Sequence, residues 1–245
     1  MAKIKLLHWN ILYQEKAENI LSLVQRINPD IFCCQEISDK NPNSKELLSG
    51  LTNIYKQHYL ETADIIGKSG ENLKLGNAIF SKFPLSNRKR VDLWNGPNPT
   101  SDNQHEQRIY IEVTLDVSGH NLTVGTTHLS FAPYFTDTPD RLAQSEKLMR
   151  VIESKESNYI ITGDFNSAPK TEIIKTIEKH LVSAGPPDSK PTFTTIPFSF
   201  LGFDAKGLEW RVDYVFATKD ISIISSKIIQ TKYSDHLPIL VELEI

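Results

Sequence analysis

The feature that most constrains the fold is an apolar run that ends abruptly in polar residues, between Tyr159 and Asn166. Its first letters, YIIT, have the composition of a buried β-strand, and Gly163 ends the run. Asp164 and Asn166 follow. Side chains two residues apart point the same way along an extended chain, so both groups are expected to face one pocket if that path continues. A carboxylate beside a carboxamide can hold and polarise water, which predicts a site at the end of a sheet.

Polar residues also lie at or near the ends of the other strand-like runs. They are Asn10, Glu36, His128, Asp213 and the adjacent pair Asp235 and His236. Each has a simpler explanation when taken alone: an asparagine at residue 10 forms turns, and a glutamate can end a strand by chance. The pattern as a whole is typical of a site built at one edge of a sheet scaffold.

The chemistry of this set is complementary. A carboxylate such as Glu36 suits a hard divalent cation, and Mg²⁺ typically takes one or two protein carboxylates together with water and phosphate oxygens. An acidic partner makes His236 either an oriented base or a stabilising cation. Asn10, His128 and Asn166 supply donors for charge that develops on phosphoryl oxygens. The sequence contains no Cys/His cluster, no GxSxG elbow and no Walker glycine loop, which excludes the usual zinc, serine-hydrolase and P-loop signatures.

Helical and strand patterns alternate along the chain. Amphipathic helices are predicted at 15–27, 44–51, 141–152 and 170–181. Strands are predicted at 3–11, 31–36, 77–81, 109–117, 122–129, 159–162, 210–216 and after Pro238, with two poorly marked strands around Tyr55 and Ile65. An exposed hairpin loop is predicted at 67–76 and a second long loop at 95–107. The aromatic loop 130–139 follows His128 and is a candidate wall of a pocket, with local loop packing as the alternative, and 184–209 is the least predictable segment. Hairpin signals mixed with helical crossovers favour one α/β domain built on two sheets over a purely parallel sheet.

Composition is that of an ordinary soluble protein. The 245 residues are 39% hydrophobic and 23% charged, so the chain is long enough to bury a sizeable core. No apolar run is long enough to span a membrane, and the N-terminus lacks the apolar region of a signal peptide. The adjacent Cys33 and Cys34 fit neither a disulfide framework nor a zinc site. We therefore expect a reducing, cytoplasmic location.

Charge argues against general attraction to polyanions, because the formal net charge is −3. The only dense basic run is Arg88-Lys89-Arg90, which we interpret as the solvated end of a strand. This weakens the case for a nucleic-acid substrate and does not exclude one.

The motifs WNI, QE, THL, GDFNS, RVDYVF and SDHLP resemble those of the endonuclease/exonuclease/phosphatase superfamily, the group with the pancreatic deoxyribonuclease fold. They run from Asn10 to Pro238 in that family's order, and GDFN together with SDHLP is a specific signal. The resemblance implies one domain over residues 1–245 with an α+β fold. That fold is a four-layer α/β/β/α sandwich, in which two mixed β-sheets pack face to face with helices outside.

The resemblance also implies a role for each matching residue. Glu36 matches the glutamate that ligates magnesium, and Asn10 matches the asparagine that supports metal and phosphate. His128 matches the histidine that contacts the scissile phosphate. Asp164 and Asn166 match the pair that positions or deprotonates the attacking water.

The last two motifs complete the set. Asp213 matches the aspartate that pairs with the final histidine, Asp235 is expected near the metal, and His236 is expected to act on phosphate or water. The implied activity is magnesium-dependent hydrolysis of phosphodiesters by in-line attack of water. Manganese is a second candidate metal because it accepts similar oxygen ligands.

The substrate stays open between several classes. WNILYQE lacks the Gly and Arg of the abasic-site repair branch, whereas GDFNSAP, PTFTT and SDHLPILVEL are more similar to the branch that contains deadenylases. A nuclease-type substrate is favoured, and the partner is expected to be a phosphoester, with nucleic acid among the candidates. The alternatives are a phosphatase or phospholipase-like hydrolase and, from another class, a catalytically silent binding module. We expect a monomer.

Overall fold

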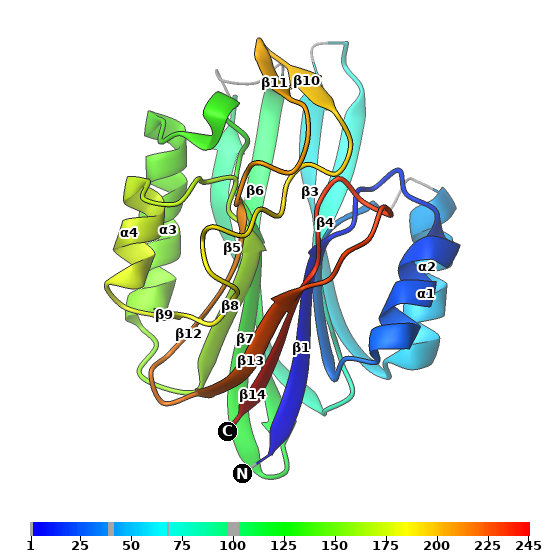
Figure 1. The fold of residues 1–245 in the computed structure, drawn as a ribbon, viewed down its shortest axis with the longest axis vertical. Helices are drawn as coiled ribbons and strands as arrows, with labels where there is room; N and C mark the ends of the chain where they lie inside the picture. The colour runs from blue at the N-terminus through cyan, green and yellow to red at the C-terminus, as the bar shows by residue number, and fades with distance from the viewer. Residues whose placement is uncertain (1, 39–41, 68, 98–102) are drawn as a thin grey trace.

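The computed structural model describes residues 2–38, 42–67, 69–97 and 103–245. Two β-layers face each other, and a pair of helices covers the outer side of each layer (Figure 1). The expected four-layer sandwich is therefore confirmed.

Six strands form the first layer. In spatial order they are β13 (Ser222–Ile228), β14 (Ile239–Glu244), β1 (Lys3–Asn10), β2 (Ile31–Ser38), β4 (Asn72–Ser81) and β3 (Gln57–Gly67). Helices α1 (Ala17–Ile27) and α2 (Pro42–Ile54) cover its outer face. Pairing of β1 with β2 is parallel and that of β1 with β14 is antiparallel, so this layer is mixed.

The second layer continues the same path of hydrogen-bonded strands. Its strands are β5 (Leu85–Gly96), β6 (Asn103–Val117), β7 (His120–His128), β8 (Tyr159–Asp164), β12 (Asp213–Ala217) and the short β9 (Val182–Ser183). Helices α3 (Pro139–Glu153) and α4 (Glu172–Glu178) cover it. Among the described residues, the strand pairing that joins the two layers lies at one corner, where the end of β3 pairs with the start of β6.

The side chains of β1 point alternately into the core between the two layers and outward against the helices. Ile4 and Leu6 point into the core between the two layers, whereas Leu7 and Trp9 point outward against the helices α1 and α2. From Leu6 onward both faces of this strand are buried, whereas Lys3 and Lys5 at its start are exposed. The inward series of every second residue ends at Asn10, at the end of the layer opposite the chain termini (Figure 1).

The hairpin predicted at 67–76 is present with a shorter loop than expected, whereas the long loop predicted at 95–107 is mostly strand among its described residues, so that prediction is wrong. Strand β4 begins at Asn72 rather than near residue 77, and β5 and β6 occupy much of 95–107. Their polar residues hid the strand period, but pairing along the β3–β4 and β5–β6 ladders satisfies the backbone. Residues 68 and 98–102 of these predicted loops lie outside the described residues.

The segment 184–209, the least predictable from the sequence, contains a small hairpin of β10 (Phe198–Phe200) and β11 (Phe203–Ala205). Helix α4 is shorter than predicted because it begins after Thr171, whose hydroxyl accepts a hydrogen bond from the Ile174 amide, and ends before Lys179. The strand predicted at 210–216 begins only at Asp213.

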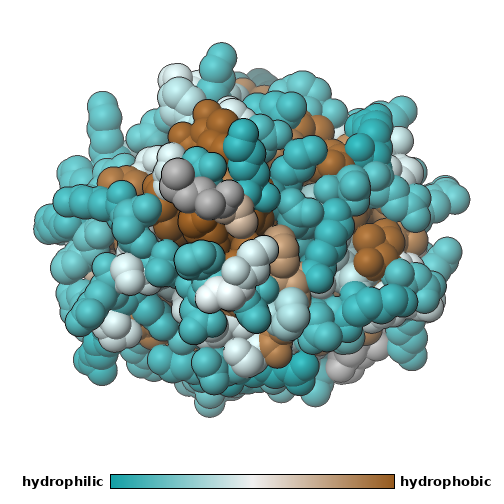
Figure 2. Space-filling model, turned by 90° about the horizontal axis from the view of Figure 1, so that it is seen from below, coloured by the Kyte–Doolittle hydropathy of each residue, from teal (hydrophilic) through white to brown (hydrophobic). Residues whose placement is uncertain are grey.

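The basic run in β5 has the solvent-facing placement that the sequence predicted. Arg88 and Lys89 are exposed, and Arg90 forms ion pairs with Glu61 and Asp92. The end of the molecule that carries the termini is covered mainly by hydrophilic side chains, with hydrophobic ones in small separate groups (Figure 2). Among the described helices, none has the length and hydropathy needed to cross a membrane.

Candidate active site

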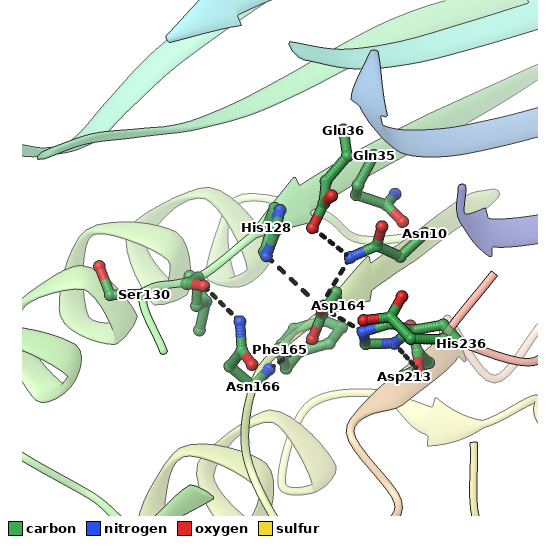
Figure 3. Close-up of polar contacts among 12 residues, drawn as sticks. Asn10, Gln35, Glu36, His128, Ser130, Asp164, Phe165, Asn166, Asp213 and His236 are labelled. Carbon is green, nitrogen blue, oxygen red and sulfur yellow. Dashed lines mark hydrogen bonds and ion pairs between the residues drawn. The ribbon is translucent and has the colours of Figure 1, made fainter. Parts of the chain in front are cut away.

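The polar strand ends meet in one cavity of about 320 Å³ at the end of the sandwich opposite the termini. Six residues singled out from the sequence line it: Glu36, His128, Asp164, Asn166, Asp235 and His236. The other two, Asn10 and Asp213, lie behind this lining and bond to it. The structure therefore brings together all eight predicted residues, and Figure 3 labels all of them except Asp235.

Strand register places three of these residues side by side. His128 at the end of β7 lies opposite Asp164 at the end of β8, and Asp164 lies opposite Asp213 at the start of β12. Paired residues on neighbouring strands project to the same face of a sheet. The sheet itself thus aligns an imidazole and two carboxylates in one row.

Asp164 is the centre of the hydrogen-bond network (Figure 3). Its Oδ2 accepts a hydrogen bond of 3.0 Å from Asn10 Nδ2 and lies 3.3 Å from His128 Nε2 and 3.6 Å from His236 Nε2. Its Oδ1 accepts from the backbone amide of Asn166. Burial raises the pKa of Asp164 to about 7, although the charge of His236 opposes this shift.

Asn166 reaches the cavity by a route that the sequence argument did not foresee. The extended path does not continue past Asp164, because Asn166 has a left-handed backbone with φ of +48°. Its Nδ2 donates to the carbonyl of Leu129, which fixes the carboxamide at the cavity wall. The prediction that both side chains face one pocket holds, but a turn produces it.

A second carboxylate orients His236. Asp213 is completely buried, and its Oδ2 lies 2.9 Å from His236 Nδ1. The backbone of His236 is fixed as well, because its amide donates to Ser234 Oγ and its carbonyl accepts from Trp9 Nε1. This arrangement points the other ring nitrogen, Nε2, toward Asp164 and the cavity.

The two cavity histidines carry different charges. Burial opposes protonation of His236, but the carboxylates of Asp213 and Asp164 raise its pKa well above the usual value. Burial and the nearby Arg108 guanidinium hold the pKa of His128 well below its usual value. At neutral pH the cavity therefore contains one imidazolium and one neutral imidazole.

Glu36 enters the cavity through an irregularity in β2. The pairing of β2 with β4 shifts register between Gln35 and Ile37, and Glu36 between them has φ of +66°. A bulge of this kind redirects one side chain. The Glu36 carboxylate accepts from Asn10 Nδ2 at 3.0 Å and from the Tyr13 amide at 3.3 Å.

Glu36 and Asp235 have the chemistry of a cation site. Both line the cavity, and burial together with the neighbouring Asp235 charge raises the pKa of Glu36. Two carboxylates that repel each other in a partly buried cavity are stabilised by a hard divalent ion, which accepts oxygen ligands. These residues fit the metal that the motif resemblance implies.

A second group is also compact enough for a cation, since ligand atoms of Asp164, Asp213 and His236 lie within 4.8 Å of one another. Both oxygens of Asp213 are already hydrogen-bonded, to His8 at 3.0 Å and to His236 at 2.9 Å. The contacts of this group are thus those of a carboxylate–imidazole network.

The sequence argument missed several lining residues. Arg108 lies on β6 beside His128 and forms an ion pair with the buried Glu106. Apolar walls come from the β3–β4 ladder and from the aromatic loops, namely Ile65, Leu73, Leu75, Phe131, Phe135, Phe193, Phe198 and Phe200. The aromatic loop 130–139 was one candidate wall, and Phe131 and Phe135 from it do line the cavity.

The loop after Asp164 is anchored from α3 by a buried arginine. Arg141 donates to the carbonyls of Thr136 and Phe165 and to the Ser167 hydroxyl. An arginine that is fully buried requires such a set of acceptors. It ties the helix to the segment that carries Asp164 and Asn166.

A family model described as endonuclease/exonuclease/phosphatase family matches residues 7–236. Rat (Rattus norvegicus) Nocturnin is 25% identical over 204 residues, which are 70% of this chain and 45% of that protein. The chain thus spans about half the length of this curated relative.

Solved structures share the fold at low identity. The endonuclease/exonuclease/phosphatase from Beutenbergia cavernae has a TM-score of 0.76 and 20% identity, covering 100% of this chain and 72% of that one. ANGEL2, a 2′,3′-cyclic phosphatase, has a TM-score of 0.71 and 16% identity, covering 98% and 95%. Since the family model spans nearly the whole chain, the protein belongs to the endonuclease/exonuclease/phosphatase family, whose members hydrolyse phosphoesters.

Proposed function

We propose that this chain is a magnesium-dependent hydrolase that cleaves phosphodiesters by in-line attack of water, with a nuclease-type substrate favoured. The observation that carries the proposal is the convergence of Asn10, His128 and His236 on one carboxylate oxygen of Asp164. Three nitrogen donors around one anionic oxygen form a place where a phosphoryl group can bind. Asp164 itself is the group left to act on water.

Each residue contributes a distinct part of the reaction. When phosphoryl oxygens take the place of Asp164 Oδ2 opposite Asn10, His128 and His236, this oxygen becomes available to accept a proton from the attacking water. A base with a pKa of about 7 is well matched to this task at neutral pH. His236, held as a cation by Asp213, stabilises the additional negative charge of the transition state.

Glu36 and Asp235 are the residues that would hold the metal, with manganese as a second candidate because it accepts similar ligands. Bound there, magnesium would supply Lewis-acid chemistry toward the phosphate. Asn10 links this acidic pair to the base, since its Nδ2 donates to both Glu36 and Asp164. The Asn10 carboxamide therefore fixes the position of Glu36, a proposed metal ligand, relative to Asp164, the proposed base.

The cavity walls support a substrate with a planar group beside its phosphate. Phe198 and Phe200 are half-buried at the cavity, and stacking on aromatic side chains is a common way to bind unpaired bases. Arg108 places a cation on the opposite strand β6. A strand end or a single-stranded segment fits a cavity of about 320 Å³ better than a duplex does.

The size of the cavity also favours a second candidate, hydrolysis of a small phosphoester. Hydrolysis assays with one panel of substrates test both candidate functions. The substrates are a single-stranded oligonucleotide, the matching duplex, a mononucleotide and a sugar phosphate, each with Mg²⁺ and with EDTA. We expect metal-dependent cleavage of the single strand and slower cleavage of the duplex. Cleavage of the monoesters alone would instead establish the phosphatase.

We expect Phe200→Ala to raise KM for the oligonucleotide, because stacking of one base on an aromatic ring contributes about 1–3 kcal/mol. This corresponds to a factor of roughly 5 or more, with little change in kcat. Leu201→Ala is the matched control, since Leu201 lies next along the hairpin with an exposed side chain. Equal KM values for the two variants in steady-state kinetics would remove base stacking on Phe200 from the account.

A further inference from the structure

A second histidine lies on the far side of Asp213. His8 follows Ile4 and Leu6 in the inward-facing series of β1, one step before Asn10. It is completely buried, and its register partners, Cys33 on β2 and Ile239 on β14, both belong to the apolar core between the layers. A polar ring at this depth is costly unless a specific partner compensates for it.

The partner of His8 is the carboxylate that orients His236. His8 Nε2 lies 3.0 Å from Asp213 Oδ1, while His236 Nδ1 lies 2.9 Å from Asp213 Oδ2. The aspartate is thus held between two imidazoles, one bonded to each oxygen. The His8 ring nitrogen on the other side, Nδ1, has no hydrogen-bond partner within the described ranges of the chain.

This arrangement assigns the proton of the ring. A carboxylate oxygen only accepts hydrogen bonds, so Nε2 of His8 must carry the hydrogen. Burial lowers the pKa of His8, which leaves a neutral ring with one N–H, directed at Asp213. The bare Nδ1 lies without a partner in the core, which is unfavourable, so the ring is not optimised for stability alone.

We propose that His8 is a positioning residue that fixes the carboxylate of Asp213 and, through it, the ring of His236. This inference rests on the proposed function. With Oδ1 held by His8, the carboxylate cannot rotate, and Oδ2 stays directed at His236 Nδ1. Without His8, both oxygens of a fully buried carboxylate compete for one imidazole, and the orientation of His236 Nε2 toward the cavity is lost.

Side-chain length allows a sharp test. The amide nitrogen of glutamine occupies nearly the place of Nε2 of histidine, whereas asparagine has the same amide one carbon shorter and cannot reach Asp213. We expect His8→Asn and His8→Leu to lower kcat for a phosphodiester by about 10- to 100-fold with KM nearly unchanged, the usual cost of losing an orienting partner. His8→Gln is expected to recover most of the loss. Cys33→Ala, which disturbs the core opposite His8 without touching Asp213, serves as the control.

A readout independent of activity separates this inference from the proposed function. In ¹⁵N-histidine NMR of the wild-type protein, His8 should be the neutral tautomer with hydrogen on Nε2, and the His236 Nδ1–H resonance should lie far downfield. That resonance should move in His8→Asn and stay in place in His8→Gln.

The outcomes are distinct. Hydrogen on Nδ1 of His8, or equal kcat in the Gln and Asn variants, would overturn the positioning role. If His8→Leu does not fold, the Gln and Asn pair still decides the question. An inactive wild-type protein would remove the proposed function, and the NMR measurement would then decide the role of His8 alone.

Discussion

Replacing Asp164 by asparagine is expected to lower kcat for a phosphodiester by about 100- to 10,000-fold, the usual effect of removing a positioned acid–base group. The variant keeps an oxygen that can accept from Asn10 or from the Asn166 amide, so the shape of the cavity is retained. What it loses is the group that accepts the proton of water. Steady-state kinetics at saturating substrate measures the effect.

The expected pH dependence of activity follows from ionisation of the Asp164 carboxyl group. Since burial raises the pKa of Asp164 to about 7, the carboxylate form that acts as base predominates only above that pH. Activity of the wild-type protein should therefore rise as the pH increases through about 7. Loss of this rise in the residual activity of Asp164→Asn would identify Asp164 as its source.

The thermal stability of Asp164→Asn supplies the control for its loss of activity. The folded-state pKa of Asp164 is above the value of about 3.9 expected in the unfolded chain, so ionisation of Asp164 lowers stability as the pH rises from about 4 to about 7. Asp164→Asn removes that cost, and its melting temperature at pH 8 should equal or exceed that of the wild type. A stable variant with wild-type kcat would rule out Asp164 as the base.

Replacing Glu36 by glutamine is expected to weaken Mg²⁺ binding by at least about 10-fold and to abolish most of the activity at low magnesium concentration. Glutamine preserves the shape and can still accept from Asn10, but it removes the charge that faces Asp235. Titration calorimetry with MgCl₂ measures the affinity directly. The matched control is Glu61→Gln, which neutralises a carboxylate that pairs with Arg90 outside the cavity.

The Glu36 variant also discriminates between the two cation sites. If Glu36→Gln binds Mg²⁺ as tightly as the wild type while His236→Gln does not, the ion belongs to the group of Asp164, Asp213 and His236 instead. Absence of Mg²⁺ binding in the wild-type protein would favour the catalytically silent binding module.

The site residues could be predicted from the sequence, but the backbone conformations that bring them into the cavity could not. GDFN and QE indicated Asp164, Asn166 and Glu36, because polar side chains at the ends of apolar runs stand out. The left-handed turn at Asn166 and the bulge at Glu36 depend on pairing with distant strands, which the local pattern does not contain.

The residues that the sequence did not indicate are those whose role depends on tertiary contacts. His8 lies inside a strand, and its function is visible only once β12 brings Asp213 next to it. The one indication of His8 in the sequence was a polar residue that continues the inward-facing series of Ile4 and Leu6. The apolar wall residues Leu73 and Leu75 of β4 were hidden by polar neighbours, which led to the prediction of a loop, whereas a strand was predicted around Ile65 of β3.

The most direct test of the central claim is hydrolysis of bis-p-nitrophenyl phosphate by the wild-type protein, with Mg²⁺ and with EDTA, beside Glu36→Ala and p-nitrophenyl phosphate. The account predicts release of p-nitrophenol from the diester that requires the metal and is lost in the variant. Cleavage that persists in EDTA, or cleavage of the monoester alone, would contradict it.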